Sequence, residues 1–456
     1  MNRLASASGG VPASNLPRSA VQGRTAWRPA IAAPAAASRD DAADAAIRFT
    51  VWVLLSSLLL QRFAVPIGEL PLSVVGPIGL LCGAYGVLNG TLVLDRRRTV
   101  ALLIIAAVGC LSALVSMAGT TARLAAISWT SLIQSLLLSS FALLAFRQPV
   151  DETRFFGAVN RWIFFVGVAG IVQFFAQFAG VSVFLFSELG VPLQWTQEIV
   201  FYNTLQTAGA GSTVIKSNGF FLVEASIYSQ MAAMGLAIEL IYFKRIRHLA
   251  VFALSLVVSL SGTGFMVLGA FIFGLVVRMG ARGAAIGAAA LAVSAFALGV
   301  LALAQPDLFN YFIGRVSEFS SPGSSAHLRF VTPFWALSDV LDQTPLSLLV
   351  GAGAGASERL HTQLTYAYNI NTPLKIAVEY GLPGLAAYLA LFLAADRTPR
   401  QSALMMPAMM LFLFTGAYSQ FAPVLFPILL ITSVPRLRAT PAREAGASEE
   451  GAPAAR

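Results

Sequence analysis

Long apolar runs separated by short polar intervals fill the chain between about residues 47 and 434. The runs lie at about 47–66, 71–93, 99–119, 125–146, 155–180, 222–243, 249–277, 284–304, 373–394, 401–416 and 418–434. Many of them reach the ~20 residues that a helix needs to cross the hydrocarbon core of a bilayer. The pattern therefore predicts an all-α fold, a polytopic bundle of membrane-spanning helices.

The run 249–277 is too long for one comfortable crossing, and Ser261-Gly262-Thr263-Gly264 interrupts it. A pair of glycines is a cheap place to break a helix. Two short helices also keep Arg278 and Arg282 on the same side as the other basic clusters. Counted in this way, the chain has about 12 transmembrane helices.

Basic residues gather in alternate intervals between the runs. The clusters are Arg96–Arg98, Arg147–Arg154, Lys244–His248, Arg397 with Arg400, and Arg436 with Arg438. Cytoplasmic loops carry an excess of Lys and Arg, so the distribution places both termini in the cytoplasm. Residues 1–46 and 435–456 are rich in small and polar residues and are expected to be disordered cytoplasmic tails. The first apolar run begins near Phe49, too late for a cleavable signal peptide.

Composition agrees with a membrane protein and narrows the function. Apolar residues make up 57% of the chain and charged residues 11%, against roughly a quarter charged in soluble domains. The net charge of +9 would suit nucleic acid, but the basic residues sit at the ends of apolar runs, which excludes that partner. Cys82 and Cys110 both fall inside apolar runs, so neither a disulfide nor a metal site is expected.

Two longer polar intervals fall on the side with few cations, a smaller one near 181–221 and a larger one at 305–372. The larger interval is the one sizeable surface predicted outside the membrane, and chemistry is expected there. From Leu328 to Leu341 the apolar residues are spaced as in an amphipathic helix, with Pro333 in its first turn. The glycines of 351–355 are interpreted as a flexible turn, because no βαβ unit surrounds them.

Five segments together resemble a known family. They are Arg329 with Trp335, the GAGAG at 351–355, Asn371–Gly384 with its Glu379-Tyr380-Gly381-Leu382-Pro383-Gly384, Lys216–Phe221, and Leu260–Gly264. Their order resembles the shared core of the O-antigen ligase and polysaccharide polymerase (Wzy/WaaL-like) superfamily. The resemblance implies a bacterial inner-membrane glycosyltransferase that acts on its periplasmic face. Its substrates would be oligosaccharides linked to undecaprenyl diphosphate.

Departures from the family pattern favour a polymerase of surface polysaccharide over a ligase. Ligases of this superfamily typically carry a His-Asn pair, where this chain has Ile370-Asn371. Lys216 and Gly262 stand where the family has arginines. A ligase that transfers glycan to lipid A core or protein remains the alternative within the superfamily.

The expected chemistry requires cations beside the departing lipid diphosphate. Fixed positive side chains stabilise such a leaving group, and Arg matches phosphate oxygens with its planar fork. Arg329, Arg315 and Lys216 are the candidates on the outer side, with Arg359 weaker. No Asp-x-Asp motif is present there to hold Mg²⁺, so the prediction is a metal-independent reaction without a cofactor.

The base for the acceptor hydroxyl is left open among His361, Glu379 and His327, which lie in or beside the large interval. Glu379 lies about two turns into an apolar run, where a buried carboxylate is costly unless it is paired. Glu224 is expected to pair with Lys216. Asn218 and Asn371 complete the candidates for substrate binding.

A transporter or flippase is the alternative from another class. It predicts charged residues near the bilayer midplane, and the second, third and fourth runs lack them. The expected partners of the polymerase are the lipid bilayer, the lipid-linked oligosaccharides, a chain-length regulator and a flippase.

Overall fold

The structure is a computed structural model that describes most of the chain. The described residues are 39–67, 70–118, 127–181, 190–192, 195–196, 206–207, 215–304, 314, 317, 319–322, 324–343, 346–358, 370–414, 416 and 420–438. Most of the two predicted tails therefore lies outside them. Arg39–Ala46 belong to a helix, which shortens the predicted N-terminal tail. Asp40 and Asp41 favour a helix N-terminus by their charge, and the alanines that follow are strong helix formers.

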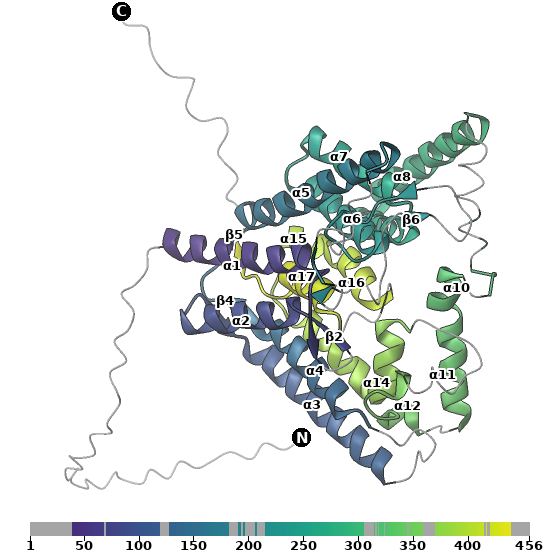
Figure 1. The fold of residues 1–456 in the computed structure, drawn as a ribbon. Coiled ribbons are helices and arrows are strands. Elements are labelled where there is room, and N and C mark those ends of the chain that lie inside the picture. Colours follow the sequence, from purple (N-terminus) through teal and green to yellow (C-terminus); the bar gives the residue numbers. More distant parts are fainter. Residues whose placement is uncertain are drawn as a thin grey trace, which may run out of the picture. The chain divides into compact units, whose positions relative to one another are not determined.

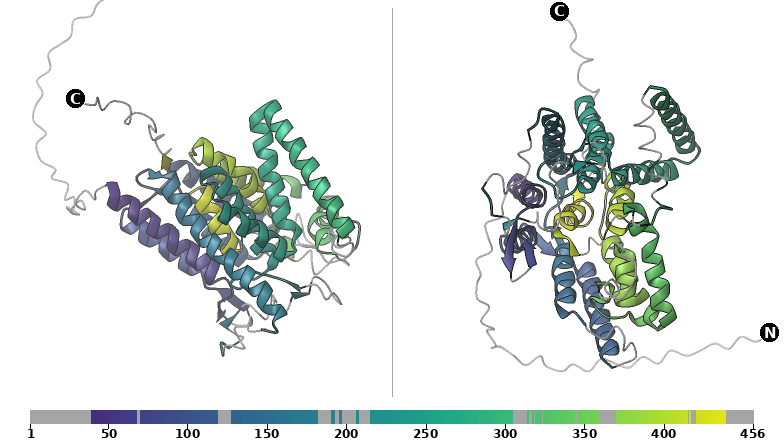
Figure 2. Two further views of the ribbon diagram at one scale, coloured as in Figure 1. Left: turned by 90° about the horizontal axis from the view of Figure 1, so that it is seen from above. Right: turned by 45° about the vertical axis from the view of Figure 1, so that its right-hand side comes forward.

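Apolar α-helices make up the described part of the chain (Figures 1 and 2). They are α1 (Arg39–Leu59), α2 (Val75–Leu88), α3 (Arg96–Met117), α4 (Trp129–Ser139), α5 (Glu152–Phe178), α6 (Ala225–Tyr242), α7 (Ile246–Ser259), α8 (Gly262–Ala304), α10 (Ser325–Phe330), α11 (Thr332–Gln343), α12 (Ser347–Val350), α14 (Thr372–Leu393), α15 (Pro399–Ala403), α16 (Met405–Phe414) and α17 (Ala422–Thr432). Five described segments are long and apolar enough to cross a membrane: Asp40–Leu59, Arg96–Met117, Glu152–Phe178, Gly262–Ala281 and Thr372–Leu393. The chain is a helical membrane protein.

Short β-strands and a 3₁₀ turn, none of them predicted from the sequence, connect the helices. They are β1 (Ala64–Ile67), β2 (Leu70–Ser73), β3 (Leu92–Leu94), η2 (Ser140–Leu143), β4 (Leu144–Phe146), β5 (Val150–Asp151), β6 (Gln206–Thr207), β7 (Ile215–Lys216) and β8 (Leu437–Arg438). The pairs β1–β2, β3–β4 and β6–β7 are antiparallel, and β5–β8 is parallel. The pairs satisfy backbone polar groups in the segments between helices. The pair β5–β8 also joins the start of α5 to the segment that follows α17.

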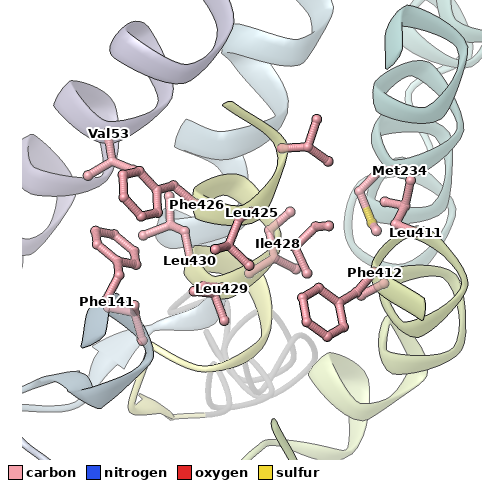
Figure 3. Close-up of a cluster of buried hydrophobic side chains, with 14 of the residues drawn as sticks. Val53, Phe141, Met234, Leu411, Phe412, Leu425, Phe426, Ile428, Leu429 and Leu430 are labelled. Atoms are coloured by element: carbon pink, nitrogen blue, oxygen red, sulfur yellow. The ribbon is translucent and has the colours of Figure 1, made fainter. Parts of the chain in front are cut away.

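The core is arranged around α17, whose residues are all buried. Phe426 stacks on Phe141 with ring centroids 4.4 Å apart, on the side of the helix where Val53 lies (Figure 3). Met234 and Phe412 lie on the opposite side (Figure 3). A helix that is apolar all round belongs in the interior of a bundle, which explains why α17 carries no charged residue.

Helix breaks occur at glycines and at one left-handed leucine. The interruption predicted at Ser261–Gly264 is present, since α7 ends at Ser259, Leu260 has φ 47°, and α8 begins at Gly262. Within α8, Gly280 is not helical, between the predicted runs 249–277 and 284–304. In α14 the break at Gly381, with φ 67°, was not predicted.

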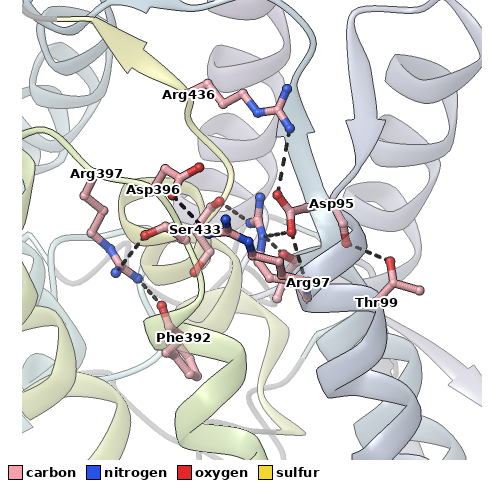
Figure 4. A network of polar contacts seen from close by, with 11 residues as sticks. Asp95, Arg97, Thr99, Phe392, Asp396, Arg397, Ser433 and Arg436 are labelled. Carbon is pink, nitrogen blue, oxygen red and sulfur yellow. Dashed lines mark hydrogen bonds and ion pairs between the residues drawn. The ribbon is translucent and has the colours of Figure 1, made fainter. Parts of the chain in front are cut away.

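One end of the bundle collects most of the basic clusters (Figure 4). Arg97 pairs with Asp396 at 3.6 Å, and Arg436 with Asp95 at 3.8 Å. The buried Arg98 donates to the carbonyl oxygens of Ala142, at 2.7 Å, and Ser433. We call this region the basic end.

The same end includes the start of α5 and the region around α15. The Glu152 carboxylate accepts hydrogen bonds from Thr398, at 2.8 Å, and Arg400, at 3.3 Å. Arg278 of α8 donates to the Pro399 carbonyl oxygen at 3.0 Å. The intervals around Arg98, Glu152, Arg278, Arg400 and Arg436, all predicted to share one side of the membrane, therefore contact one another at one end of the bundle.

Asp95 gives the basic end a pH-dependent contribution to stability. Burial raises the pKa of its carboxyl, but the hydrogen bond from the Arg98 backbone N–H and the Arg98 charge outweigh burial, so the pKa lies below its ordinary value. A carboxyl whose pKa is lower in the folded protein than in the unfolded chain stabilises the fold at pH values above its unfolded-state pKa, which is near 4. This stabilisation is lost as the pH falls through the folded-state pKa.

We therefore expect Asp95→Asn, which keeps the helix cap, to destabilise the protein by about 1 kcal/mol or less at pH 7. The difference should shrink as the pH falls below about 4. Thermal unfolding of both proteins in detergent at pH 7 and pH 3 measures it. An equal difference at both values would show that the Asp95 charge is not the cause.

Candidate functional site

The opposite end of the bundle brings together three of the segments that carry the family resemblance. The backbone N–H of Ser217 donates to the Val258 carbonyl oxygen at 2.9 Å, which ties Lys216–Phe221 to the end of α7. At the start of α8, Gly264 N–H donates to Ser229 Oγ at 3.1 Å and Thr263 Oγ1 to the Ser226 carbonyl oxygen at 3.3 Å. Both segments therefore surround the start of α6. We call this region the loop end.

Arg62, just beyond α1, fixes the loop that precedes α6. Its buried guanidinium donates to the Phe220 carbonyl oxygen at 2.8 Å, and Phe220 has φ 62°. The neighbouring Gln61 accepts from the Val223 N–H through its Oε1 at 3.0 Å. Arg62 was not predicted as a site residue from the sequence. The sequence did contain a signal for it, because Arg62 is a lone arginine on the side of the bundle that has few cations.

Arg329 reaches this loop from the large polar interval. Its Nη2 lies 3.6 Å from Glu224 Oε2, and the two side chains are 20% and 33% exposed. Ser226 donates its hydroxyl to the same carboxylate. A separation of 3.6 Å is longer than a good hydrogen bond. Within the described residues, the guanidinium is thus held near Glu224 by charge, with its five donors suited to a further anion.

The segment that carries Arg329 forms two helices. Ser324 Oγ caps α10 by accepting from the His327 N–H at 3.2 Å, and Arg329 lies in the last turn of α10. The amphipathic helix predicted from Leu328 to Leu341 is divided, because Leu328–Phe330 end α10. Its remainder is α11, which begins at Thr332 and has Pro333 in its first turn as expected. His327 is buried with its ring against Trp335, the centroids 5.2 Å apart.

The glycine segment 351–355 is a buried loop instead of a flexible turn. Ala352 N–H donates to the Val378 carbonyl oxygen at 2.8 Å, and Gly353 N–H to that of Glu379 at 3.1 Å. Ser112 of α3 donates to the Glu379 carbonyl oxygen at 2.8 Å. A side chain at Gly351 would place its Cβ 2.3 Å from that oxygen. The loop therefore packs tightly against α14 beside its break at Gly381.

Below this loop, Ser357, Lys375 and Glu379 form a buried polar cluster. Lys375 Nζ lies 3.0 Å from Glu379 Oε1 and 2.9 Å from Ser357 Oγ. Ser357 donates to Glu379 Oε1 at 2.5 Å. The Lys375 and Glu379 side chains are 4% and 1% exposed. The pairing that sequence reasoning required of a buried Glu379 is therefore present.

Packing of α11 links the segment that carries Arg329 to the buried cluster of Ser357, Lys375 and Glu379. Ala336 and Val340 of α11 form a small buried core with Ala352, Ala356 and Val378. Figure 1 shows α11 beside α12 and α14. The helix that follows Arg329 thus rests on the same loop and helix that carry Ser357 and Glu379.

The remaining predicted residues have structural partners or lie outside the described part. Asn218 is buried; its Oδ1 accepts from Gln173 Nε2 and its Nδ2 donates to the Leu222 carbonyl oxygen, both at 2.8 Å. Asn371 caps α14 by accepting from the Leu374 N–H at 3.1 Å. Both amides therefore hold local structure.

Lys216 lies in β7, and its carbonyl oxygen accepts from Gln177 at 3.2 Å. The structure pairs Glu224 with Arg329, where the sequence suggested Lys216. Arg315 and His361 lie outside the described residues.

Comparison with known proteins adds no relative to this picture. No model of a known protein family matches the chain. No curated protein matches it in sequence.

The loop end offers two chemically different places. Around Arg329 the guanidinium and the backbone loop before α6 suit an anion. Around Glu379 the described residues include two carboxylates and one ammonium, counting Glu358 3.6 Å from Lys375, and these three groups together carry a net negative charge. Among the described residues, no group of three or more His, Cys, Asp or Glu side chains is placed to hold a metal ion.

Proposed function

We propose that the protein is a polysaccharide polymerase that joins oligosaccharide repeat units carried on undecaprenyl diphosphate. The product would be an exopolysaccharide, a capsule or an O-antigen. The observation that carries this proposal is the ion pair of Arg329 with Glu224, because it brings the large polar interval to the Lys216–Phe221 and Leu260–Gly264 segments. Three separate parts of the family resemblance thus share one end of the bundle.

The chemistry places Arg329 at the leaving group. An acceptor hydroxyl attacks the anomeric carbon of the first sugar while the lipid diphosphate departs with the electron pair of the broken C–O bond. Arg329 meets the charge that develops on the diphosphate, with Arg315 and Lys216 as further candidates. The base remains to be chosen among His327, His361 and Glu379.

Membrane orientation follows from charge. The basic end holds Arg96–Arg98, Arg154 and Arg400, so by the positive-inside rule it faces the cytoplasm with both termini. The loop end then faces the periplasm, with residues 305–372 as its large loop in a bundle of about 12 spans. The proposed location is the bacterial inner membrane.

One observation favours a transporter as the second candidate. α14 is broken at Gly381 and carries a buried Lys375–Glu379 pair, and interrupted helices with charged groups are common at transporter binding sites. The pair lies within about two turns of the start of α14. It is therefore closer to the loop end than a site at the bilayer midplane would be.

Glycolipid analysis of a strain that lacks the gene tests the proposal. We expect single repeat units to accumulate on the lipid carrier on the periplasmic face, with no long polymer. Polymer that is made but remains unattached would indicate a ligase, and units trapped on the cytoplasmic face would indicate a flippase. Polymer of normal amount and length would reject the proposal.

A further inference from the structure

We infer that Ser357, Lys375 and Glu379 form the acceptor-sugar subsite, in which Glu379 Oε2 takes the proton of the attacking hydroxyl. The inference builds on the glycan transfer proposed above and assigns two residues, Ser357 and Lys375, that the sequence did not single out.

The carboxylate of Glu379 is held on one side only. Its Oε1 accepts from Ser357 at 2.5 Å and lies 3.0 Å from Lys375 Nζ. Its Oε2 is buried and has no hydrogen-bond partner within the described residues. An unpaired buried acceptor costs free energy. This oxygen can accept a hydrogen bond from a donor that comes with a ligand.

The cluster extends to the protein surface through Glu358. Glu358 follows Ser357 directly, its side chain is 70% exposed, and its Oε1 lies 3.6 Å from Lys375 Nζ. The ammonium of Lys375 therefore lies between a buried carboxylate and one at the surface. The cluster sits immediately beneath the protein surface, at the edge of the large polar interval.

Charge identifies the class of ligand. Among the described residues, two carboxylates face one ammonium, so a phosphate or another anion would be repelled there. A neutral polyol fits, because a hydroxyl donates to a carboxylate and accepts from an ammonium. The diphosphate therefore belongs beside Arg329, and the acceptor sugar beside Glu379.

The proposed step balances without a cofactor. The acceptor O–H bond breaks, its proton passes to Glu379 Oε2, and the oxygen forms a bond to the anomeric carbon. The bond from that carbon to the diphosphate oxygen breaks, and its electron pair leaves with the lipid diphosphate. Glu379 afterwards releases the proton to water. Lys375 and Ser357 are positioning residues, because they hold Oε1 so that Oε2 faces the hydroxyl.

The test measures polymer formation in membrane vesicles supplied with lipid-linked repeat units purified from the deletion strain. Glu379→Gln should lower turnover by at least about 100-fold. Glu152→Gln is the matched control, because Glu152 is also a buried, cation-paired carboxylate but lies at the basic end. It should keep turnover within about threefold of wild type. Added formate should restore turnover to Glu379→Ala by replacing the missing carboxylate.

A double variant separates catalysis from folding. Glu379→Gln alone leaves the Lys375 charge buried without its partner, whereas Lys375→Met with Glu379→Gln removes both charges. We expect the double variant to reach wild-type levels in the membrane and to remain inactive. Turnover close to wild type in the double variant, or a folded Glu379→Ala that formate does not rescue, would overturn the inference.

The same assay distinguishes the two proposals. If Arg329→Ala is inactive and Glu379→Gln is active, only the acceptor subsite is wrong. If vesicles without the protein extend the units as fast as vesicles with it, the polymerase function is wrong.

Discussion

Arg329→Ala is expected to abolish detectable polymer while the protein stays in the membrane. Removing one preorganised donor from a developing negative charge typically costs 100-fold to 1000-fold in rate. The Arg329 side chain is half-buried, and within the described residues its ion pair with Glu224 is long, at 3.6 Å, so its loss should leave the fold intact. Immunoblots of polymer length, together with the amount of protein in the membrane, measure the effect.

Two further variants make this result specific. Arg329→Lys keeps the charge without the bidentate fork and should retain a small part of the activity. Arg154→Ala removes an arginine from an exposed pair with Asp44 at 2.7 Å at the basic end, and should leave polymer unchanged. Polymer of unchanged length in Arg329→Ala would show that the leaving group is stabilised elsewhere.

The sequence predicted the helices of this fold well where the apolar runs were long. Runs such as 99–119, 155–180 and 373–394 correspond to α3, α5 and α14, because length and hydropathy alone determine a spanning helix. The run 125–146 was predicted less well. It divides into α4, the turn η2 and β4. The tertiary pairing of β4 with β3 ends the helix there, and local pattern carries no information about that partner.

The candidate site was predicted in part. Arg329 was recognised from the family resemblance and from the need for a cation at a departing diphosphate. Glu224 and Glu379 were recognised because charges next to, or inside, apolar runs are unusual. Their partners could not be assigned. The pairing of Glu224 with Arg329 depends on how α10 approaches α6, which no local spacing encodes. Lys375 lies four residues before Glu379, a spacing that favours a helical ion pair, and this was the available signal that went unused.

The glycine loop shows most clearly why sequence pattern fell short. The run Gly351–Gly355 was interpreted as a flexible turn because no βαβ unit surrounds it. In the structure the loop glycines allow the backbone to approach α14 closely, and Gly351 has φ 79°. Gly381, at the break in α14 that faces the loop, has φ 67°. The loop in turn positions Ser357 against Lys375. Close backbone approach is a property of two segments together, and a single segment does not reveal it.

Gly351→Ala should therefore destabilise the protein strongly. A methyl group at this position would lie 2.3 Å from the Glu379 carbonyl oxygen, and alanine is strained at this φ. Strain and overpacking together predict a loss of about 2–4 kcal/mol. The matched control is Gly269→Ala in α8, where an added Cβ meets nothing within 4 Å and a helical alanine gains up to about 1 kcal/mol. Thermal unfolding of both variants in detergent compares them. Equal midpoints would mean that the loop does not depend on its contact with α14, and the placement of Ser357 against Lys375 and Glu379 would then lose its structural basis.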